Sequence, residues 1–350
     1  MTEGKTPCAF VTGATGLLGN NLVRELLSRG FQVRALVRSR AKGATLLPVS
    51  PRLELVEGDM ANVAGFAPHL ANADIVFHTA AFFRDSLTGG DHWAELERVN
   101  VAGTRALVEA AYKAGIRRFL HVSSIGTLAI AGPEGRAVDE TMRMTPEATK
   151  NDYYRSKILA DREIETALER HPDLWAAYIL PGFMHGPGDA GPTAAGQTIL
   201  DFVEGKLPGV VDAHFSYVDA RDVAIAAIEA TEKAARGDRF IVAGRTFHMR
   251  EVFSMLEKIT GKPAPKRSVP RVAIAFIAGL NEIWTRLSRR PALISWSIYR
   301  TIRDEGPYGR FDSARAQHYL GVKFRPIEET LRDSFAWLST SHSKGLRAQG

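Results

Sequence analysis

Three glycines at regular spacing constrain the fold of this 350-residue chain more than any other feature. They are Gly13, Gly16 and Gly19, within the segment TGATGLLG at residues 12–19. Apolar residues 8–12 before them are typical of a strand, and residues 17–28 after them carry apolar positions at helical spacing. Glycines at such a junction allow a tight turn and close backbone approach, and the helix N-terminus attracts anions. An ordinary glycine-rich turn would contain the same residues, so the following segments distinguish the two.

Strands and helical patterns alternate through the first half of the chain. Strands are expected at 32–37, 53–57, 74–79, 117–123 and 175–180, and the main helical patterns cover 93–114 and 152 to about 170. This alternation predicts a parallel, doubly wound α/β sheet of the Rossmann type with right-handed crossovers over residues 1–180. In that context the glycine loop is predicted to hold the pyrophosphate of a dinucleotide.

The second half of the chain differs from the first in its composition and in its pattern of strands and helices. Residues 182–197 are rich in Gly and Pro and are predicted to form a mobile loop over a site. Further strands are expected near 215–218 and 240–242, and helices near 221–233, 249–260, 272–287 and 328–338. We expect residues 181–340 to form a smaller, mixed substrate-binding lobe interleaved with the sheet, and residues 341–350 to form a flexible tail.

Composition narrows the class of protein. The lone cysteine, Cys8, excludes an internal disulfide, fits a reducing compartment and is expected to be a buried structural thiol. The N-terminal residues resemble a first strand, not a signal peptide, and no stretch has the 18 apolar residues of a membrane span. The net charge of +6 comes from dispersed basic residues, which disfavours a nucleic-acid partner. These features predict a cytoplasmic protein.

The end of the second strand indicates which dinucleotide is preferred. An acidic residue there would bind the ribose 2′-hydroxyl of NAD, but the segment VRALVRSRAK has Arg38 at this place, followed by Arg40 and Lys42. A guanidinium can bind a phosphate with two parallel hydrogen bonds. We therefore expect NADP(H), with Arg38 as the main contact and NAD(H) as the alternative. A solvated basic turn would also explain these residues.

A second motif, YYRSK at residues 153–157, places Tyr153 and Lys157 four residues apart, on one face of a helix. A free tyrosine titrates near pH 10, and a neighbouring ammonium favours its phenolate. Combined with a dinucleotide site, the pair suggests hydride transfer with tyrosine as proton donor. A tyrosine and a lysine at this spacing are common on helices, so the motif means little alone.

Taken in order, the motifs resemble those of the extended short-chain dehydrogenases/reductases. The matching segments are TGATGLLG, GDM (58–60), HTAA (78–81), NVAGT (100–104), VSSIGT (122–127), YYRSK, ILPGFMHGPGD (179–189) and YVDARDVA (217–224), over about two thirds of the chain. The resemblance implies that Tyr153 is the general acid/base and that Lys157 lowers its pKa and holds the nicotinamide ribose. Ser124 would hydrogen-bond the substrate oxygen. Tyr154 and Ser123 compete for two of these roles, and the family's spacing favours Tyr153 and Ser124.

The resemblance also implies a set of cofactor and substrate contacts. Besides Tyr153 and Lys157, the cofactor-binding residues would be Gly13, Thr15, Gly16, Leu17, Leu18, Gly19, Arg38, Asp59, Met60, Thr79, Ala80, Ala81, Asn100, Pro181, Gly182 and Met184. The substrate contacts would be Phe82, Ser124 and His185, the last standing where the family usually has Tyr. Each of these residues could instead be purely structural. No metal-binding spacing of His or Cys is present.

Three activities and one silent role are compatible with this machinery. Dehydratases of the family carry an acidic pair after the catalytic Ser or Thr, whereas Ile125 and Gly126 follow Ser124 here. Epimerases bind a nucleotide diphosphate partly through an arginine, but the matching stretch holds His214 and Phe215, with no arginine before Arg221. This weakens the epimerase alternative. A catalytically silent NADP-binding sensor or scaffold usually lacks the Tyr or Lys that this chain retains.

The apolar stretch at residues 268–300, with Phe276, Trp284, Trp296 and Tyr299, resembles the dihydroflavonol 4-reductase and 3β-hydroxysteroid dehydrogenase branch of the family. That resemblance implies interconversion of a carbonyl and an alcohol on a bulky, apolar substrate. Core packing or a dimer face would also explain the stretch, and a homodimer is the family default. A peripheral membrane role is the further alternative, since Arg286, Arg289 and Arg290 end the apolar run.

Overall fold

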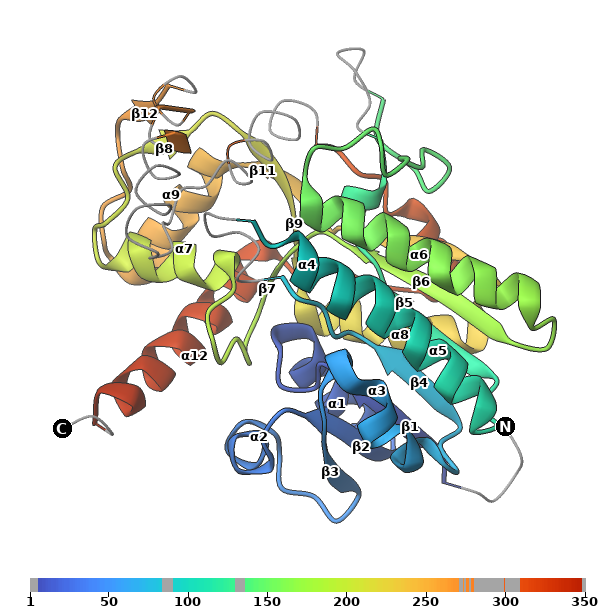
Figure 1. Cartoon of the computed structure of the whole chain (residues 1–350). Helices are drawn as coiled ribbons and strands as arrows, with labels where there is room; N and C mark the ends of the chain where they lie inside the picture. The colour runs from blue at the N-terminus through green and yellow to red at the C-terminus, as the bar shows by residue number, and fades with distance from the viewer. Residues whose placement is uncertain are drawn as a thin grey trace.

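The computed structural model describes residues 6–83, 91–129, 136–270 and 309–347, together with isolated positions between 271 and 308. Seven parallel strands form the main sheet in the order β10-β6-β5-β4-β1-β2-β3 (Figure 1). Their bounds are β1 Cys8–Thr12, β2 Gln32–Val37, β3 Leu53–Glu57, β4 Ile75–His78, β5 Arg118–Val122, β6 Trp175–Pro181 and β10 Arg239–Val242. The order confirms the predicted doubly wound sheet.

Helices cover both faces of this sheet (Figure 1). On one face, α1 (Leu17–Ser28) and α8 (Ala220–Lys233) pack against each other and against the sheet around Leu22, Leu26 and Val223. On the other face, α3 (Val63–Phe66), α5 (Gly103–Lys113) and α6 (Asp152–Arg170) bury Phe66, Leu107 and Ile164. The short helix α2 (Arg40–Leu46) follows β2. Burial on both faces explains why the strands are almost continuously apolar.

The helix expected at 93–114 is present but not uniform. It consists of α4 (Trp93–Leu96), a π-helical stretch at Glu97–Ala102 and α5. Single π-helical turns commonly mark functional positions in helices. The π-helical stretch contains Asn100, which the sequence had singled out.

A second lobe packs beside the carboxyl ends of the strands (Figure 1). It contains a sheet of order β11-β9-β7 and the pair β12-β8, with strand bounds β7 Phe183–His185, β8 Val210–Val211, β9 His214–Asp219, β11 Arg245–His248 and β12 Ser268–Val269. Helices α7 (Ala194–Val203), α9 (Met249–Thr260) and α12 (Ile327–Arg347) surround a separate apolar core that includes Ile199, Phe253 and Leu331. Strand β10 and helix α8, although late in the chain, belong to the main sheet layer.

The prediction of a continuous loop at 182–197 is wrong. Strand β7 lies within it, and α7 begins at Ala194. The strand forms because its backbone pairs in parallel with β9, with Phe183 beside Tyr217 and His185 beside Asp219. Such pairing is a tertiary contact that local Gly and Pro content does not reveal.

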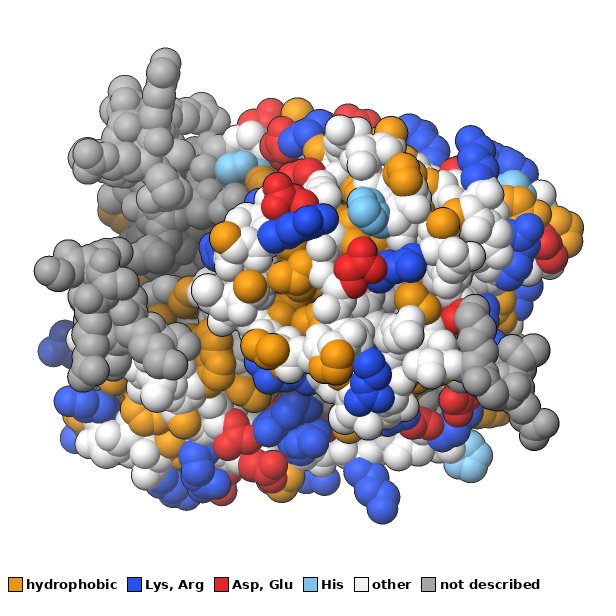
Figure 2. All heavy atoms as spheres, turned by 90° about the horizontal axis from the view of Figure 1, so that it is seen from below, with side chains coloured by type: hydrophobic (Ala, Val, Ile, Leu, Met, Phe, Trp, Pro, Cys, Tyr) orange, Lys and Arg blue, Asp and Glu red, His pale blue; other side chains and the backbone are white. Residues whose placement is uncertain are grey.

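Several expectations concern the surface and the apolar stretch. Most of the helix expected at 272–287 lies outside the described residues, as do Trp284, Arg286, Arg289, Arg290 and Trp296. The few described positions within 272–287 are helical, among them Phe276, which is exposed. In the part of the chain that the structure describes, no helix is both long and apolar enough to cross a membrane. The face seen in Figure 2 carries basic and acidic side chains interspersed, as the dispersed charges of the sequence predicted. Cys8 is buried, as expected for a structural thiol.

Candidate active site

The glycine loop and the end of β4 meet at the crevice of the sheet. Gly13 has φ +68°, and a Cβ atom there would lie 2.7 Å from the backbone nitrogen of Ala80. A side chain at Gly19 would lie 2.1 Å from the carbonyl oxygen of Gly13. Only glycine therefore allows the loop, helix α1 and Thr79–Ala80 to approach this closely. Thr79 adds a hydrogen bond from its hydroxyl to the carbonyl oxygen of Thr12 at 2.7 Å.

The N-terminus of α1 has the properties of a pyrophosphate site. Its first residue follows Gly16, which is exposed and caps the helix without any side-chain hydrogen bond. The first turn, which begins at Leu17 and Leu18, contains no acidic residue. Uncapped N–H groups and the positive end of the helix dipole both favour an anion, so the residues present fit a dinucleotide phosphate. Thr15 is part of the same loop and is half-buried.

A buried histidine supports this loop from beneath. His78 Nδ1 lies 2.8 Å from the Thr12 hydroxyl, and its Nε2 lies 2.9 Å from the Thr104 hydroxyl. The Thr104 hydroxyl donates to the Asn100 carbonyl at 2.6 Å, so it must accept from His78 Nε2–H. In a neutral ring with its proton on Nε2, Nδ1 accepts from the Thr12 hydroxyl. Burial, with His121 and Lys157 adding to it, holds the pKa of His78 well below its usual range.

The predicted adenosine contacts follow β2 and β3. Arg38 is exposed directly after β2, and Glu57 at the end of β3 accepts a hydrogen bond from the backbone of Arg40 at 3.0 Å. Asp59 is exposed and caps the next turn through the backbone N–H of Ala61, while Met60 is buried. Arg38 thus lies at the carboxyl end of its strand, as the sequence placed it, and is exposed to solvent.

Asn100 connects the segment after β4 to helix α6 (Asp152–Arg170). Its side-chain oxygen accepts from the backbone N–H of Phe82 at 2.7 Å, and its amide donates to the Phe82 carbonyl at 3.2 Å. The same amide donates to the Ser156 hydroxyl at 3.0 Å, and Ser156 donates to the carbonyl of Tyr153 at 2.7 Å. One buried amide therefore holds both Phe82 and the first turn of α6. Ala81, beside Phe82, is exposed.

Helix α6 presents Tyr153 and Lys157 toward the sheet. Asn151 begins the helix by accepting from the backbone N–H groups of Tyr153 and Tyr154. The Tyr153 ring lies 4.7 Å from that of Phe83, centroid to centroid, and the Lys157 ammonium donates to the Val122 carbonyl at 2.6 Å. Phe83 was not identified from the sequence, although it directly follows the predicted contact Phe82.

Burial is the largest influence on the pKa values of Tyr153 and Lys157. Burial raises the pKa of Tyr153 above its usual range, and Asp161 adds to this effect. Burial lowers the pKa of the Lys157 ammonium to about 8, whereas Asp161 acts in the opposite direction. The effect of Lys157 on the pKa of Tyr153 stays a prediction. The ammonium binds a backbone carbonyl, and loss of hydration dominates at the phenol.

The two serines at the end of β5 have different surroundings. The Ser123 hydroxyl is buried and donates to Asp161 at 2.8 Å. Ser124 is partly exposed, and its oxygen accepts from the backbone N–H of Gly126 at 3.1 Å. The Ser124 proton remains available for a ligand oxygen, because that bond uses only a lone pair. This difference favours Ser124 over Ser123 as a substrate contact.

Tyr154 covers the turn after Ser124. A Cβ atom at Gly126 would lie 2.3 Å from two ring carbons of Tyr154. Any longer side chain at position 126 would therefore displace this ring. The acidic side chain that a dehydratase of the family carries in this region has no room here while Tyr154 keeps its place.

The remaining predicted contacts lie where β6 continues into β7. Pro181 ends β6, and Gly182 donates its backbone N–H to the Val242 carbonyl at 3.2 Å. Met184 is half-buried. His185 is only 4% exposed, and among the described residues neither of its ring nitrogens has a hydrogen-bond partner. Burial lowers the pKa of His185 to about 4, with Asp219 acting in the opposite direction.

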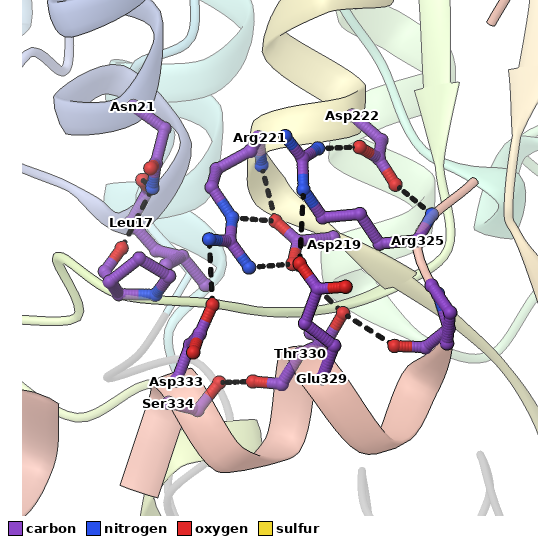
Figure 3. Close-up of polar contacts among 12 residues, drawn as sticks. Leu17, Asn21, Asp219, Arg221, Asp222, Arg325, Glu329, Thr330, Asp333 and Ser334 are labelled. Atoms are coloured by element: carbon purple, nitrogen blue, oxygen red, sulfur yellow. Dashed lines mark hydrogen bonds and ion pairs between the residues drawn. The ribbon is translucent and has the colours of Figure 1, made fainter. Parts of the chain in front are cut away.

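Arg221, the first arginine after the stretch compared with epimerases, is engaged by two carboxylates. It forms ion pairs of 2.7 Å with Asp219 and 2.7 Å with Asp333, the latter on α12 (Figure 3). Asp219 also accepts from the Thr330 hydroxyl at 2.8 Å. Nearby, Asn21 of α1 donates to the carbonyl of Pro187 at 2.8 Å. These contacts attach α12 and the turn after β7 to the main sheet layer.

Comparison with known proteins gives the family. The model of the NAD dependent epimerase/dehydratase family matches residues 9–244. Sterol demethylase protein B of Methylococcus capsulatus is 35% identical over 330 residues, which cover 94% of this chain and 97% of that protein. A putative dihydroflavonol 4-reductase of a Synechocystis species is 33% identical, covering 94% of each.

A solved structure agrees with this assignment. The crystal structure of gox2253 superposes with a TM-score of 0.79 at 29% sequence identity, covering 96% of this chain and 98% of that one. The sequence matches, the strand order and the uncapped helix after the glycine loop all support the same family. The chain therefore belongs to the NAD dependent epimerase/dehydratase family, that of the extended short-chain dehydrogenases/reductases, and is an NAD(P)-dependent oxidoreductase.

Proposed function

We propose that this enzyme interconverts a carbonyl and an alcohol on a bulky, largely apolar substrate, uses NADP(H), and employs Tyr153 as its general acid/base. The observation that carries the proposal is the grouping of Tyr153 and Lys157 on α6 with the Ser124 end of β5, beside a loop suited to a dinucleotide. A sterol or a compound of similar size and polarity is the substrate class that we infer. The name of the relative from Methylococcus capsulatus supports this choice.

The lobe formed by residues 181–340 is our proposed substrate-binding part. Its described core is rich in aromatic side chains, with Phe183, Phe215, Tyr217 and Phe247 in mutual contact around β7, β9 and β11. Apolar walls with few polar groups suit a ligand that is itself largely hydrocarbon. Phe82 and His185, at the border between this lobe and the sheet, are the proposed side-chain contacts.

In the direction of reduction, the bound nicotinamide would supply the hydride. Ser124 would donate a hydrogen bond to the carbonyl oxygen and so orient the substrate. Tyr153 is half-buried and its raised pKa keeps it protonated at neutral pH, so that it would transfer its proton to that oxygen. Lys157 would hold the ribose and stabilise negative charge that develops on the phenolic oxygen. The reverse reaction would use the same groups in the opposite order.

Preference for NADP(H) rests on Arg38. Its guanidinium is exposed at the end of β2, where an acidic side chain would repel a 2′-phosphate. We expect Arg38→Ala to weaken NADPH binding about tenfold or more while changing NADH binding little. Arg52→Ala is the matched control. Arg52 is an exposed arginine before β3, at the amino ends of the strands, whereas Arg38 lies at their carboxyl ends. Equal losses for both cofactors would contradict the role of Arg38.

A nucleotide-sugar epimerase is the alternative activity. It would require a cation for the diphosphate, and Arg221 is engaged by Asp219 and Asp333. A silent sensor is the alternative of another class, and it would bind cofactor without turnover. Only a reductase or a dehydrogenase changes the net amounts of oxidised and reduced cofactor. This change distinguishes the proposal from both alternatives.

The experiment is a titration of the purified protein with NADPH and NADH, followed by assays with ketones, aldehydes and sterols at the nicotinamide absorbance. The proposal predicts NADPH oxidation with apolar carbonyl substrates. It also predicts that Tyr153→Phe loses at least about 100-fold in turnover while NADPH binding changes little. Unchanged turnover in Tyr153→Phe would refute the assignment of the acid.

A further inference from the structure

A buried carboxylate lies one turn beyond Lys157 on the same helix. Asp161 is 1% exposed, and three side chains from the sheet converge on it. The Ser123 hydroxyl donates to it at 2.8 Å, His121 Nε2 lies 3.2 Å from its other oxygen, and Arg239 of β10 forms an ion pair with it. The residue has no part in the mechanism described above.

Stability alone is a weak explanation for this arrangement. Arg239 is also buried, with its guanidinium 4.5 Å from the centre of the Tyr178 ring. Removing two charges from water costs several kcal/mol for each, and well-packed apolar pairs often replace such ion pairs without loss. The position of Asp161, between β5 and the catalytic helix, suggests a role in the active site.

Lys157 and Asp161 together hold the end of β5 at consecutive residues. The Lys157 ammonium donates to the carbonyl of Val122, and Asp161 accepts from the hydroxyl of Ser123. The next residue is Ser124. Two side chains one turn apart on α6 therefore determine where the end of this strand lies relative to the helix that carries Tyr153.

We propose that Asp161 is a positioning residue of the active site, which fixes the strand end bearing Ser124 through Ser123 and provides the counter-charge for the buried Lys157 ammonium. This inference rests on the proposed roles of Ser124 and Lys157. A carboxylate at this place can act in this way only while it is ionised. Although burial disfavours its charge, the Arg239 guanidinium holds the pKa of Asp161 below its usual range.

The other ionisable groups around this carboxylate leave it as the dominant anion beside Lys157. They are His78 of β4, His121 of β5, Tyr178 of β6, Arg239 of β10, and Tyr153 and Glu165 of α6. Burial, reinforced by Lys157, lowers the pKa of His121 to about 4, so this ring is neutral near pH 7. Glu165 is partly exposed and lies 3.6 Å from Arg239.

The test is a pH titration of Lys157 itself. NMR of protein labelled with ¹³C at the lysine ε-carbons reports the titration, and Lys157→Arg assigns the signal. In Asp161→Asn, we expect the midpoint of Lys157 to fall by about one pH unit or more, because an opposite charge nearby has been removed. Ser123→Ala is the matched control, since it removes a hydrogen bond to Asp161 but no charge. Its midpoint should stay at the wild-type value.

A second variant covers the case in which Asp161→Asn does not fold because Arg239 is left unpaired. Asp161→Asn with Arg239→Met removes both charges, and Arg239 is not among the groups that shift the pKa of Lys157. The midpoint should fall in this variant as well. An unchanged Lys157 midpoint in whichever of the two variants folds would overturn the proposal.

Kinetics then separate positioning from simple loss of structure. In Asp161→Asn the alkaline limb of the kcat/KM profile, which reports groups of the free enzyme, should move to lower pH together with the Lys157 midpoint, and Asp161→Glu should restore it. An unmoved limb would refute the role in the active site. The NMR titration needs neither substrate nor cofactor. If Lys157 shifts as expected but Tyr153→Phe retains full turnover, the proposed function fails while the coupling of Asp161 to Lys157 stands.

Discussion

His185 offers a quantitative test of how this fold tolerates a buried imidazole. The ring is 4% exposed and lies between Phe183, with centroids 5.4 Å apart, and Tyr217, at 5.6 Å. Its pKa of about 4 lies below the usual value of 6.5, mainly because of burial. Between these two pH values the unfolded chain binds the proton more readily, so the free energy of unfolding falls as the pH is lowered through this window.

The size of the effect follows from the two pKa values. This one residue costs the native state about 2 kcal/mol at pH 5 and almost nothing at pH 7.5. His185→Phe should remove that cost. At pH 7.5 the loss of two unpartnered ring nitrogens should raise the free energy of unfolding, and the larger volume of phenylalanine should lower it. Neither effect depends on pH, so both cancel when the two pH values are compared.

The assay is urea denaturation at pH 7.5 and pH 5.0. We expect the wild-type protein to lose about 2 kcal/mol more than His185→Phe between the two conditions. His318→Phe is the matched control, because His318 is exposed, and it should lose as much as the wild type. If His185→Phe and the wild type lost the same free energy of unfolding between these pH values, burial of His185 would not lower its pKa. A changed KM in the same variant would support His185 as a substrate contact.

Three further predictions concern the surroundings of Ser124 and the cofactor loop. Gly126→Ala should lower the free energy of unfolding by about 2 kcal/mol because its methyl group meets the Tyr154 ring. In denaturant titrations, the double variant with Tyr154→Ala should lose less than the sum of the two single losses. Ser124→Ala should reduce kcat/KM about 100-fold, whereas Ser123→Ala should reduce it less. Gly13→Ala should abolish detectable NADPH binding by fluorescence titration, since φ +68° and the close Ala80 backbone both exclude a side chain; retained affinity would refute the proposed loop geometry.

The sequence was most informative where local pattern and tertiary environment agree. Strands 8–12, 32–37 and 53–57 and helix 17–28 have the predicted bounds, because both faces of the sheet are buried and the apolar periodicity is strong. The short strand β7 was missed, since its backbone pairs with β9 and the Gly and Pro residues around it resemble a loop. The π-helical stretch at Glu97–Ala102 carries no periodicity signal of its own.

The candidate site could be located from motifs, but its electrostatics could not. The ion pair between Asp161 and Arg239 joins residues 78 positions apart, and nothing near Arg239 marks it as a partner of α6. Asp161 itself stands four residues after Lys157, so helical spacing could have drawn attention to it. The raised pKa of Tyr153 follows from burial, which a motif does not report. The roles given to Ser124, Tyr153 and Lys157 stay predictions.

The most direct test of the central claim follows the hydrogen that is transferred. The protein is incubated with NADPH deuterated at the transferable position of the nicotinamide and with a 3-ketosteroid, and the product is analysed by mass spectrometry. Our account predicts an alcohol with one deuterium on the former carbonyl carbon, and no such product from Tyr153→Phe. Tight binding of the cofactor with no deuterium transfer and no net oxidation across a panel of apolar ketones, aldehydes and sterols would contradict it.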